Sequence, residues 1–209
     1  MLITDFADPY PLSSPPQAYP FPSFNLKMII YKCRVSGEEF ISDAYKLRPV
    51  VDPDTKEEVP GLMECDSIKV NKDSGASVDI GCGGEFGGGG EDEAVDDTVE
   101  TVNNVIDEGI GFGYNETPMG KKDFKGWLKE YVPAVWKLLK EDDKIPKEEV
   151  KAFKQSSSDF SVFLLKKFDD LQFFVGPSFN PEGAMAMAYY TGATPTFIYI
   201  KAGLIEEKC

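Results

Sequence analysis

The chain has 209 residues, a length that allows one domain with at most a short appendage. Its 22 lysines and arginines stand against 36 aspartates and glutamates, and the net charge of -14 argues against a general nucleic-acid or anionic-membrane binder. The chain contains no histidine, which excludes Ser-His-Asp and Cys-His catalytic arrangements and imidazole metal ligands.

The cysteine pattern indicates neither a redox motif nor a zinc site. The cysteines stand at positions 33, 65, 82 and 209, and no two of them form a C-x-x-C pair. A chain of this size needs no disulfide to fold, so we expect free thiols and a reducing compartment, the cytosol. No uninterrupted apolar run approaches the roughly 20 residues needed to cross a bilayer.

The first 27 residues differ in composition from the rest of the chain. They hold six prolines and a single lysine, and they have neither the basic start nor the continuous apolar stretch of a secretory signal. Two interpretations are open, a polyproline-type docking segment and an unstructured tail. We predict the unstructured tail, followed by a single domain over residues 28–209.

Three strands are predicted in the first part of that domain. Residues 28–35 alternate apolar and polar side chains, as a half-buried strand does. Residues 45–51 and 62–70 have the composition of two further strands, and the turn-rich stretch DPDTKEEVPG at 52–61 links them.

Residues 73–120 form an acidic segment. They contain 12 acidic residues and no lysine or arginine, and seven glycines lie between Gly81 and Gly90. We predict a long mobile loop over residues 71–97, whose glycine cluster lacks the G-K-[ST] ending of a phosphate-binding loop. For residues 98–106 the spacing is helical but the side chains are β-branched, so periodicity alone does not decide between helix and strand.

The acidic loop contains candidate ligands for a hard cation. Asp92, Glu93, Asp96 and Asp97 offer the carboxylate oxygens that Ca²⁺ prefers, although no EF-hand spacing is present. Ordering a glycine-rich chain costs backbone entropy, so we expect weak binding, with a dissociation constant no lower than about 10⁻⁴ M. The alternative is a solvated acidic loop that binds no ion. We expect the protein to require no cofactor.

A helical hairpin is predicted over residues 121–168. In residues 121–141 the apolar side chains recur at i, i+3 and i+4, which indicates an amphipathic helix with a kink near Pro133. Pro146 suits an early helical position of a second helix, whose apolar stripe reaches Phe168.

Strand patterns return after the hairpin, at residues 171–175, 184–190 and 195–200. Strands, then a helical hairpin, then strands again define the fold class as α+β.

The first helix of the hairpin is also basic, and four of its lysines gather near its start: Lys121, Lys122, Lys125 and Lys129. One interpretation is a solvated helix face. The other is a docking surface for an acidic protein such as tubulin. We expect the apolar stripe, with Trp127 and Trp136, to pack inward on the second helix, which leaves the lysines outward.

The sequence offers little for catalysis. Carboxylates are plentiful, but nothing identifies a pair held at working distance, and serine or cysteine nucleophiles would lack an imidazole base. We therefore predict a binding protein and no enzyme. An enzyme with an unrecognised carboxylate site is the competing class, and a deep pocket with two converging carboxylates of strongly shifted pKa would favour it.

Several short segments resemble the translationally controlled tumour protein family. They are MIIY at 28–31, SDAYK at 42–46, FDDLQFFVG at 168–176, NPEG at 180–183, TPTFIYIKAGL at 194–204 and EEKC at 206–209. The resemblance covers residues 28–209. It implies a β-tent of small mixed sheets, related to the small Rab-interacting chaperone proteins, with a projecting helical hairpin. It also favours strand over helix for residues 98–106.

The resemblance further implies a set of partners. Members of the family are cytoplasmic and are linked to weak calcium binding, to microtubules through the helical region, to small Ras-type GTPases, and to cell growth and survival. Glu39 matches the glutamate through which the family contacts its GTPase, but Pro177 replaces the usual partner glutamate. The chain also departs from the family's loop signature I-G-[GA]-N-x-S-x-E, because it has IGCGGEFGGGG at that place. Regulation of a small Ras- or Rab-type GTPase, as an exchange factor or chaperone, is therefore an alternative function.

Overall fold

The computed structural model describes residues 28–72 and 100–209. The predicted tail at 1–27 and all but the start of the predicted acidic loop lie outside the described residues. The strands are β1 (Ile29–Cys33), β2 (Glu39–Ser42), β3 (Arg48–Val51), β4 (Glu58–Asp66), β5 (Lys69–Asn71), β6 (Thr101–Asn103), β7 (Asn115–Glu116), β8 (Gln172–Val175), β9 (Met185–Tyr190), β10 (Pro195–Ile200) and β11 (Leu204–Lys208). The helices are α1 (Lys121–Glu141) and α2 (Lys147–Lys166), with short 3₁₀ turns η1 (Phe168–Asp170) and η2 (Lys201–Gly203).

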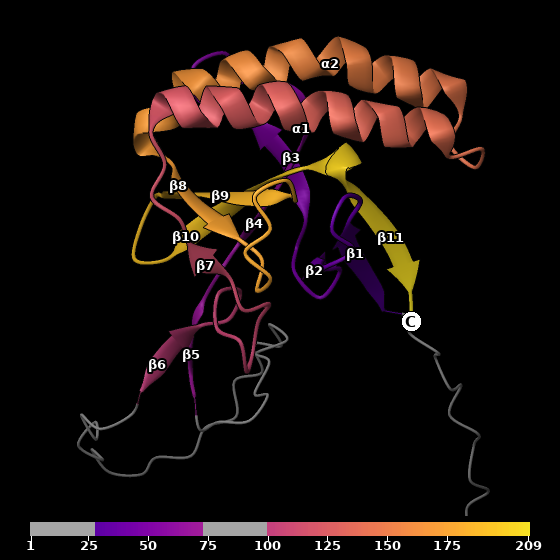
Figure 1. The fold of residues 1–209 in the computed structure, drawn as a ribbon. Coiled ribbons are helices and arrows are strands. Elements are labelled where there is room, and N and C mark those ends of the chain that lie inside the picture. Colours follow the sequence, from indigo (N-terminus) through magenta and orange to yellow (C-terminus); the bar gives the residue numbers. More distant parts are fainter. Residues whose placement is uncertain (1–27, 73–99) are drawn as a thin grey trace, which may run out of the picture.

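The described strands form three antiparallel sheets (Figure 1). The largest has the order β3-β4-β10-β9-β8-β7, a second has the order β11-β1-β2, and β5 pairs with β6. Every residue of β10 is buried, which explains why its sequence is apolar apart from Thr196. Sheets and helices enclose one hydrophobic core, with Phe40, Phe124, Phe160, Phe197 and Tyr199 among its fully buried side chains.

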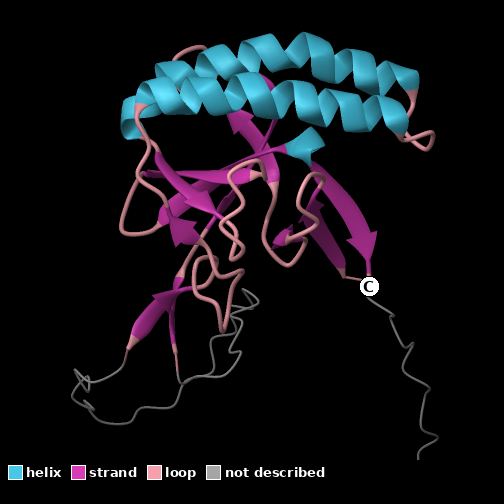
Figure 2. Cartoon of the chain, in the orientation of Figure 1, coloured by secondary structure: helices cyan, strands magenta, loops and turns pink. Residues whose placement is uncertain are grey.

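The two helices lie side by side along one end of the sheets (Figure 2). The ring of Phe124 in α1 lies 4.7 Å from that of Phe173 in β8. Helix α2 approaches β4 closely at Gly61, where an added Cβ would lie 3.0 Å from Ser156 Oγ and 3.1 Å from the ring of Phe160. Gly61 also has a φ of +88°, so glycine is needed there both for its backbone conformation and for the helix contact.

The architecture confirms the α+β class and the helical hairpin. The bounds of α1 coincide with the predicted 121–141, and the helix continues through Pro133. The strand that the resemblance favoured over a helix for residues 98–106 is present as β6.

Other boundaries were predicted wrongly. Strand β4 begins at Glu58, inside the predicted turn, because Glu58 pairs with Val51 across a bulge in the β3 register. Pro146 is not helical but forms the N-cap of α2, and Phe168 lies in η1 beyond the end of α2. Three strands were missed altogether: β2, β7 and β11.

Candidate functional site

The four predicted docking lysines share the exposed side of α1, and together they are called the basic face below: Lys121, Lys122, Lys125 and Lys129. Among them, Lys122, Lys125 and Lys129 follow i, i+3, i+7 spacing, which places them on one side of a helix. Within residues 28–72 and 100–209 none of these three has an acidic side chain within ion-pair distance, whereas Lys121 lies 3.7 Å from Asp169.

The buried side of α1 determines which way these lysines point. It consists of Phe124, Trp127, Leu128, Tyr131, Val135 and Leu139, which pack into the core. The predicted placement of the two tryptophans was wrong for one of them. Trp127 stacks on Tyr131 at 4.6 Å and its indole N–H donates to Gly183 O, so it packs toward the β8–β9 connection. Trp136 is the one beside α2, with Lys154 of that helix 5.6 Å from its ring.

The predicted GTPase contact, Glu39, is the first residue of β2. Its side chain is 51% exposed, and its one ion pair in the described part of the chain is with Lys32 at 3.5 Å. Lys32 in turn lies 2.7 Å from Glu207 in β11. Glu39 is therefore accessible and only loosely held.

The neighbouring Glu38 has a structural role. Its carboxylate accepts a hydrogen bond of 2.8 Å from the backbone N–H of Ser178, in the loop that follows β8. Burial raises the pKa of Glu38, but hydrogen bonds from Ser178 and Ser36 outweigh it and hold the pKa below its ordinary value. The Glu38 oxygen also lies 2.8 Å from where a Cβ on Gly176 would be, so the carboxylate fills the space beside this glycine.

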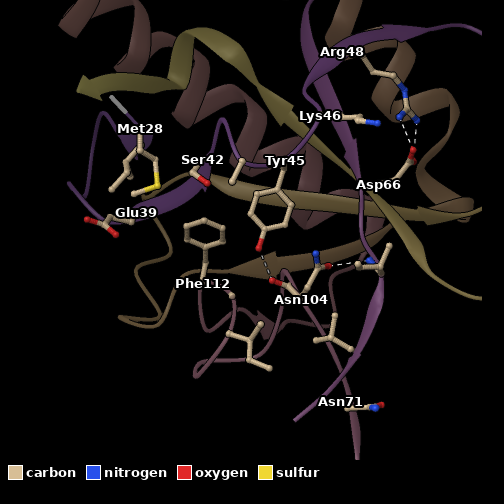
Figure 3. A pocket seen from close by; sticks show the side chains of 16 residues that line it. Met28, Glu39, Ser42, Tyr45, Lys46, Arg48, Asp66, Asn71, Asn104 and Phe112 are labelled. Atoms are coloured by element: carbon tan, nitrogen blue, oxygen red, sulfur yellow. Dashed lines mark hydrogen bonds and ion pairs between the residues drawn. The ribbon is translucent and has the colours of Figure 1, made fainter. Parts of the chain in front are cut away.

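A groove of about 570 Å³ opens beside Glu39, between β1, β2, β5 and residues 104–112 (Figure 3). One wall is held by Tyr45, whose hydroxyl donates to Asn104 O at 2.6 Å, while Asn104 Oδ1 accepts from the backbone N–H of Ile68 at 2.8 Å. Asp66 at one end is bound by the guanidinium of Arg48.

The acidic residues of this groove do not form a catalytic pair. Hydrogen bonds from Arg48 hold the pKa of Asp66 below its ordinary value, against the opposing effect of partial burial. Glu39 is paired with Lys32. Each of these two carboxylates is thus paired with a basic side chain.

The remaining predicted sites are not visible in the described part of the chain. Asp92, Glu93, Asp96 and Asp97, the predicted calcium ligands, lie outside it. Within residues 28–72 and 100–209, no three acidic or cysteine side chains gather as metal ligands would. Cys33, Cys65 and Cys209 are free thiols, and neither described helix is long and apolar enough to span a bilayer.

Fold and surfaces together define an α+β protein with an exposed basic helix face and an exposed carboxylate beside an apolar groove.

Comparison with known sequences gives the family. The model of the translationally controlled tumour protein family matches residues 28–205. A translationally-controlled tumor protein homolog from Theileria annulata is 33% identical over 184 residues, covering 87% of this chain and 99% of the relative. The homolog from Schizosaccharomyces pombe is 32% identical over 185 residues, with the same coverage.

Solved structures agree with this assignment. Translationally controlled tumor-associated protein p23fyp from Schizosaccharomyces pombe superposes with a TM-score of 0.62 at 31% identity, over 87% of this chain and 99% of that chain. The translationally-controlled tumor protein of Caenorhabditis elegans shares the fold, with a TM-score of 0.53 at 24% identity over 87% of this chain and 98% of that one. The chain belongs to the translationally controlled tumour protein family.

Proposed function

We propose that this protein is a non-enzymatic binding protein of the cytosol, and that its basic face docks onto acidic protein surfaces such as that of tubulin. One observation carries the proposal. Lys122, Lys125 and Lys129 point away from the core along one helix side, and none of them has an ion-pair partner within the described residues. Their positive charge is therefore available to a partner, in a chain whose net charge is negative.

Co-sedimentation with microtubules tests the proposal. The variant Lys122→Glu/Lys125→Glu/Lys129→Glu should lose binding, and it should still fold because the three side chains are exposed and have no ion pair among the described residues. A matched control places the same charge change on exposed lysines elsewhere in the hairpin: Lys144, Lys147 and Lys151. Binding that survives in the first variant, or is lost equally in the control, would contradict a specific role for the basic face.

Salt dependence supplies a second readout. Exposed charges mainly speed encounter and add little affinity each, so the contact should be weak. The Debye length is about 8 Å at 0.15 M ionic strength and about 3 Å at 1 M, so binding should fade steeply between these two conditions. Binding insensitive to salt would assign the lysines to a solvated helix face.

Regulation of a small Ras- or Rab-type GTPase is the second candidate, and the exposure of Glu39 favours it. Stopped-flow measurement of nucleotide release from such a GTPase, with and without excess protein, tests it. We expect acceleration that Glu39→Gln reduces, whereas Glu58→Gln, a substitution of another exposed strand glutamate, should leave it unchanged. Release that is unaffected by the protein would exclude this function.

A further inference from the structure

The groove beside Glu39 gathers exposed apolar side chains from separate parts of the chain. Met28, Ile68 and Ile110 line it and are 45%, 48% and 38% exposed. Ile30 and Phe112 add apolar surface to its walls. Single exposed hydrophobic residues are ordinary, but three of them around one concavity indicate a site for an apolar ligand.

The charges around the groove favour a ligand of low charge. Arg48 binds Asp66 through two hydrogen bonds and the buried Glu64 through a third, and Glu39 is paired with Lys32. Lys46 is the remaining charged side chain of the lining. An apolar, nearly uncharged polypeptide therefore fits better than a phosphate or an acidic peptide.

Chain continuity points to one such polypeptide. Met28 is the first residue of the described domain and belongs to the groove's wall (Figure 3), so the residues before it join the domain at the groove itself. Residues 17–27 read QAYPFPSFNLK, with three aromatic residues, two prolines and Lys27 as the one charged side chain. At about 3.1 Å per residue in a polyproline conformation, Phe24 can lie about 12 Å from Met28.

We propose that residues 17–27 bind in this groove in cis, with Tyr19, Phe21 and Phe24 as the side chains that contact its apolar walls. Proline-rich segments bind aromatic-lined grooves at low entropic cost because their conformation is already restricted. A short tether gives an effective concentration of about 1 mM, so even a dissociation constant of about 0.1 mM would fill the groove about nine-tenths of the time.

The segment is an addition to the family's common domain. The family match begins at residue 28. The alignments with the Theileria annulata and Schizosaccharomyces pombe relatives cover 99% of each relative but 87% of this chain. The proposed contact therefore involves residues that precede the family match.

Backbone amide NMR spectra of the full chain test the proposal. Tyr19→Ser/Phe21→Ser/Phe24→Ser should shift the amide signals of residues that line the groove, Ile68 and Ile110 among them, while Phe6→Ser/Tyr10→Ser should not. In the groove, Ile110→Asp should move the same set of signals. A matched control is Val162→Asp, because Val162 is 64% exposed but lies on α2.

A second measurement uses the domain alone, since relatives that match it over almost their whole length have been solved as structures. A peptide of residues 17–27, added to residues 28–209, should bind at the groove with a dissociation constant below about 1 mM, the effective concentration of the tether. The triple-serine peptide should bind at least about tenfold more weakly, as expected from loss of three buried aromatic contacts. Signals that shift only in the hairpin, no difference between the full chain and its triple variant, or no saturation at millimolar peptide would each overturn the proposal. Shifts that grow with protein concentration would overturn it in favour of a second copy of the chain.

Discussion

Replacing Arg48 with methionine tests how much an ionic cluster at the end of β4 stabilises the fold. Arg48 Nε donates to Glu64 Oε1 at 2.9 Å, and its two terminal nitrogens donate to the oxygens of Asp66 at 2.5 and 2.9 Å. The Glu64 side chain is only 8% exposed, and its other hydrogen bond within residues 28–72 and 100–209 comes from the hydroxyl of Tyr189 at 2.9 Å. Removing the guanidinium therefore leaves the buried carboxylate of Glu64 with the hydrogen bond from Tyr189 but without its ion pair.

The expected cost follows from the exposure of the partners. Breaking a fully buried ion pair costs about 3–5 kcal/mol, whereas an exposed pair contributes about 0–1 kcal/mol. Here the carboxylate of Glu64 is buried, but the side chains of Arg48 and Asp66 are 43% and 58% exposed. We therefore expect Arg48→Met to lower the free energy of unfolding by about 1–3 kcal/mol, between these two limits.

The pH dependence has a definite sign. Hydrogen bonds from Arg48 depress the pKa of Asp66, with burial opposing and a hydrogen bond from Thr196 assisting. A carboxyl group whose pKa is depressed by folding stabilises the fold above its unfolded pKa, about 3.9 for aspartate. That stabilisation is lost as the pH falls through the folded pKa. The difference between wild type and Arg48→Met should thus be largest near pH 7 and shrink below about pH 4.

Urea denaturation at pH 7 and pH 3 measures both effects. Lys46→Met is the matched control, since Lys46 is exposed and has no ion pair among the described residues, and it should change the free energy of unfolding by less than about 0.5 kcal/mol. An Arg48→Met effect no larger than that of the control at pH 7, or one that persists undiminished at pH 3, would refute the reasoning.

Three further predictions concern a turn, a loop and the acidic segment. Gly111→Ala should cost about 1–3 kcal/mol in urea denaturation, because its Cβ would collide with the backbone of Val105, while Gly192→Ala, with open space around it, should be nearly neutral. Phe179→Asn should raise the melting temperature by about 2–4 °C, since Phe179 has a φ of +53° that asparagine tolerates better; an unchanged melting temperature would contradict this. Calorimetry should give a calcium dissociation constant no lower than about 10⁻⁴ M. Micromolar binding of fixed stoichiometry would contradict a weak site, and no binding at millimolar calcium would contradict a site formed by Asp92, Glu93, Asp96 and Asp97.

The sequence predicted those elements whose side chains carry a sustained pattern. Helix α1 keeps its apolar spacing over 21 residues, and β10 is apolar apart from Thr196 because it is buried on both faces. Strand β11 has four exposed residues out of five and pairs only with β1, from the other end of the domain. Nothing local distinguishes such a polar edge strand from a loop, so it was missed.

The candidate sites depend even more on distant contacts. Adjacent glutamates Glu38 and Glu39 look alike in sequence, and only the loop at Ser178, 140 residues away, shows which is structural and which is exposed. The residues that line the groove are equally hard to recognise from the sequence. Its exposed isoleucines, Ile68 and Ile110, are single apolar residues between polar or glycine neighbours, so no periodic pattern marks them.

The positive charges of this protein differ in whether they have partners within the described part of the fold. Lys32 is held between Glu39 and Glu207, and Asp54 is the common ion-pair partner of Lys166 and Lys167 at the end of α2. Near the end of α1, Lys140 lies 4.6 Å from the ring of Trp136. Each of these lysines contacts another side chain of the fold, so its substitution changes the stability of the protein as well as its surface charge. The lysines at 122, 125 and 129 have no such ties in the described residues, so their substitution changes the surface potential with little effect on the fold, and a loss of binding can be assigned to the surface itself.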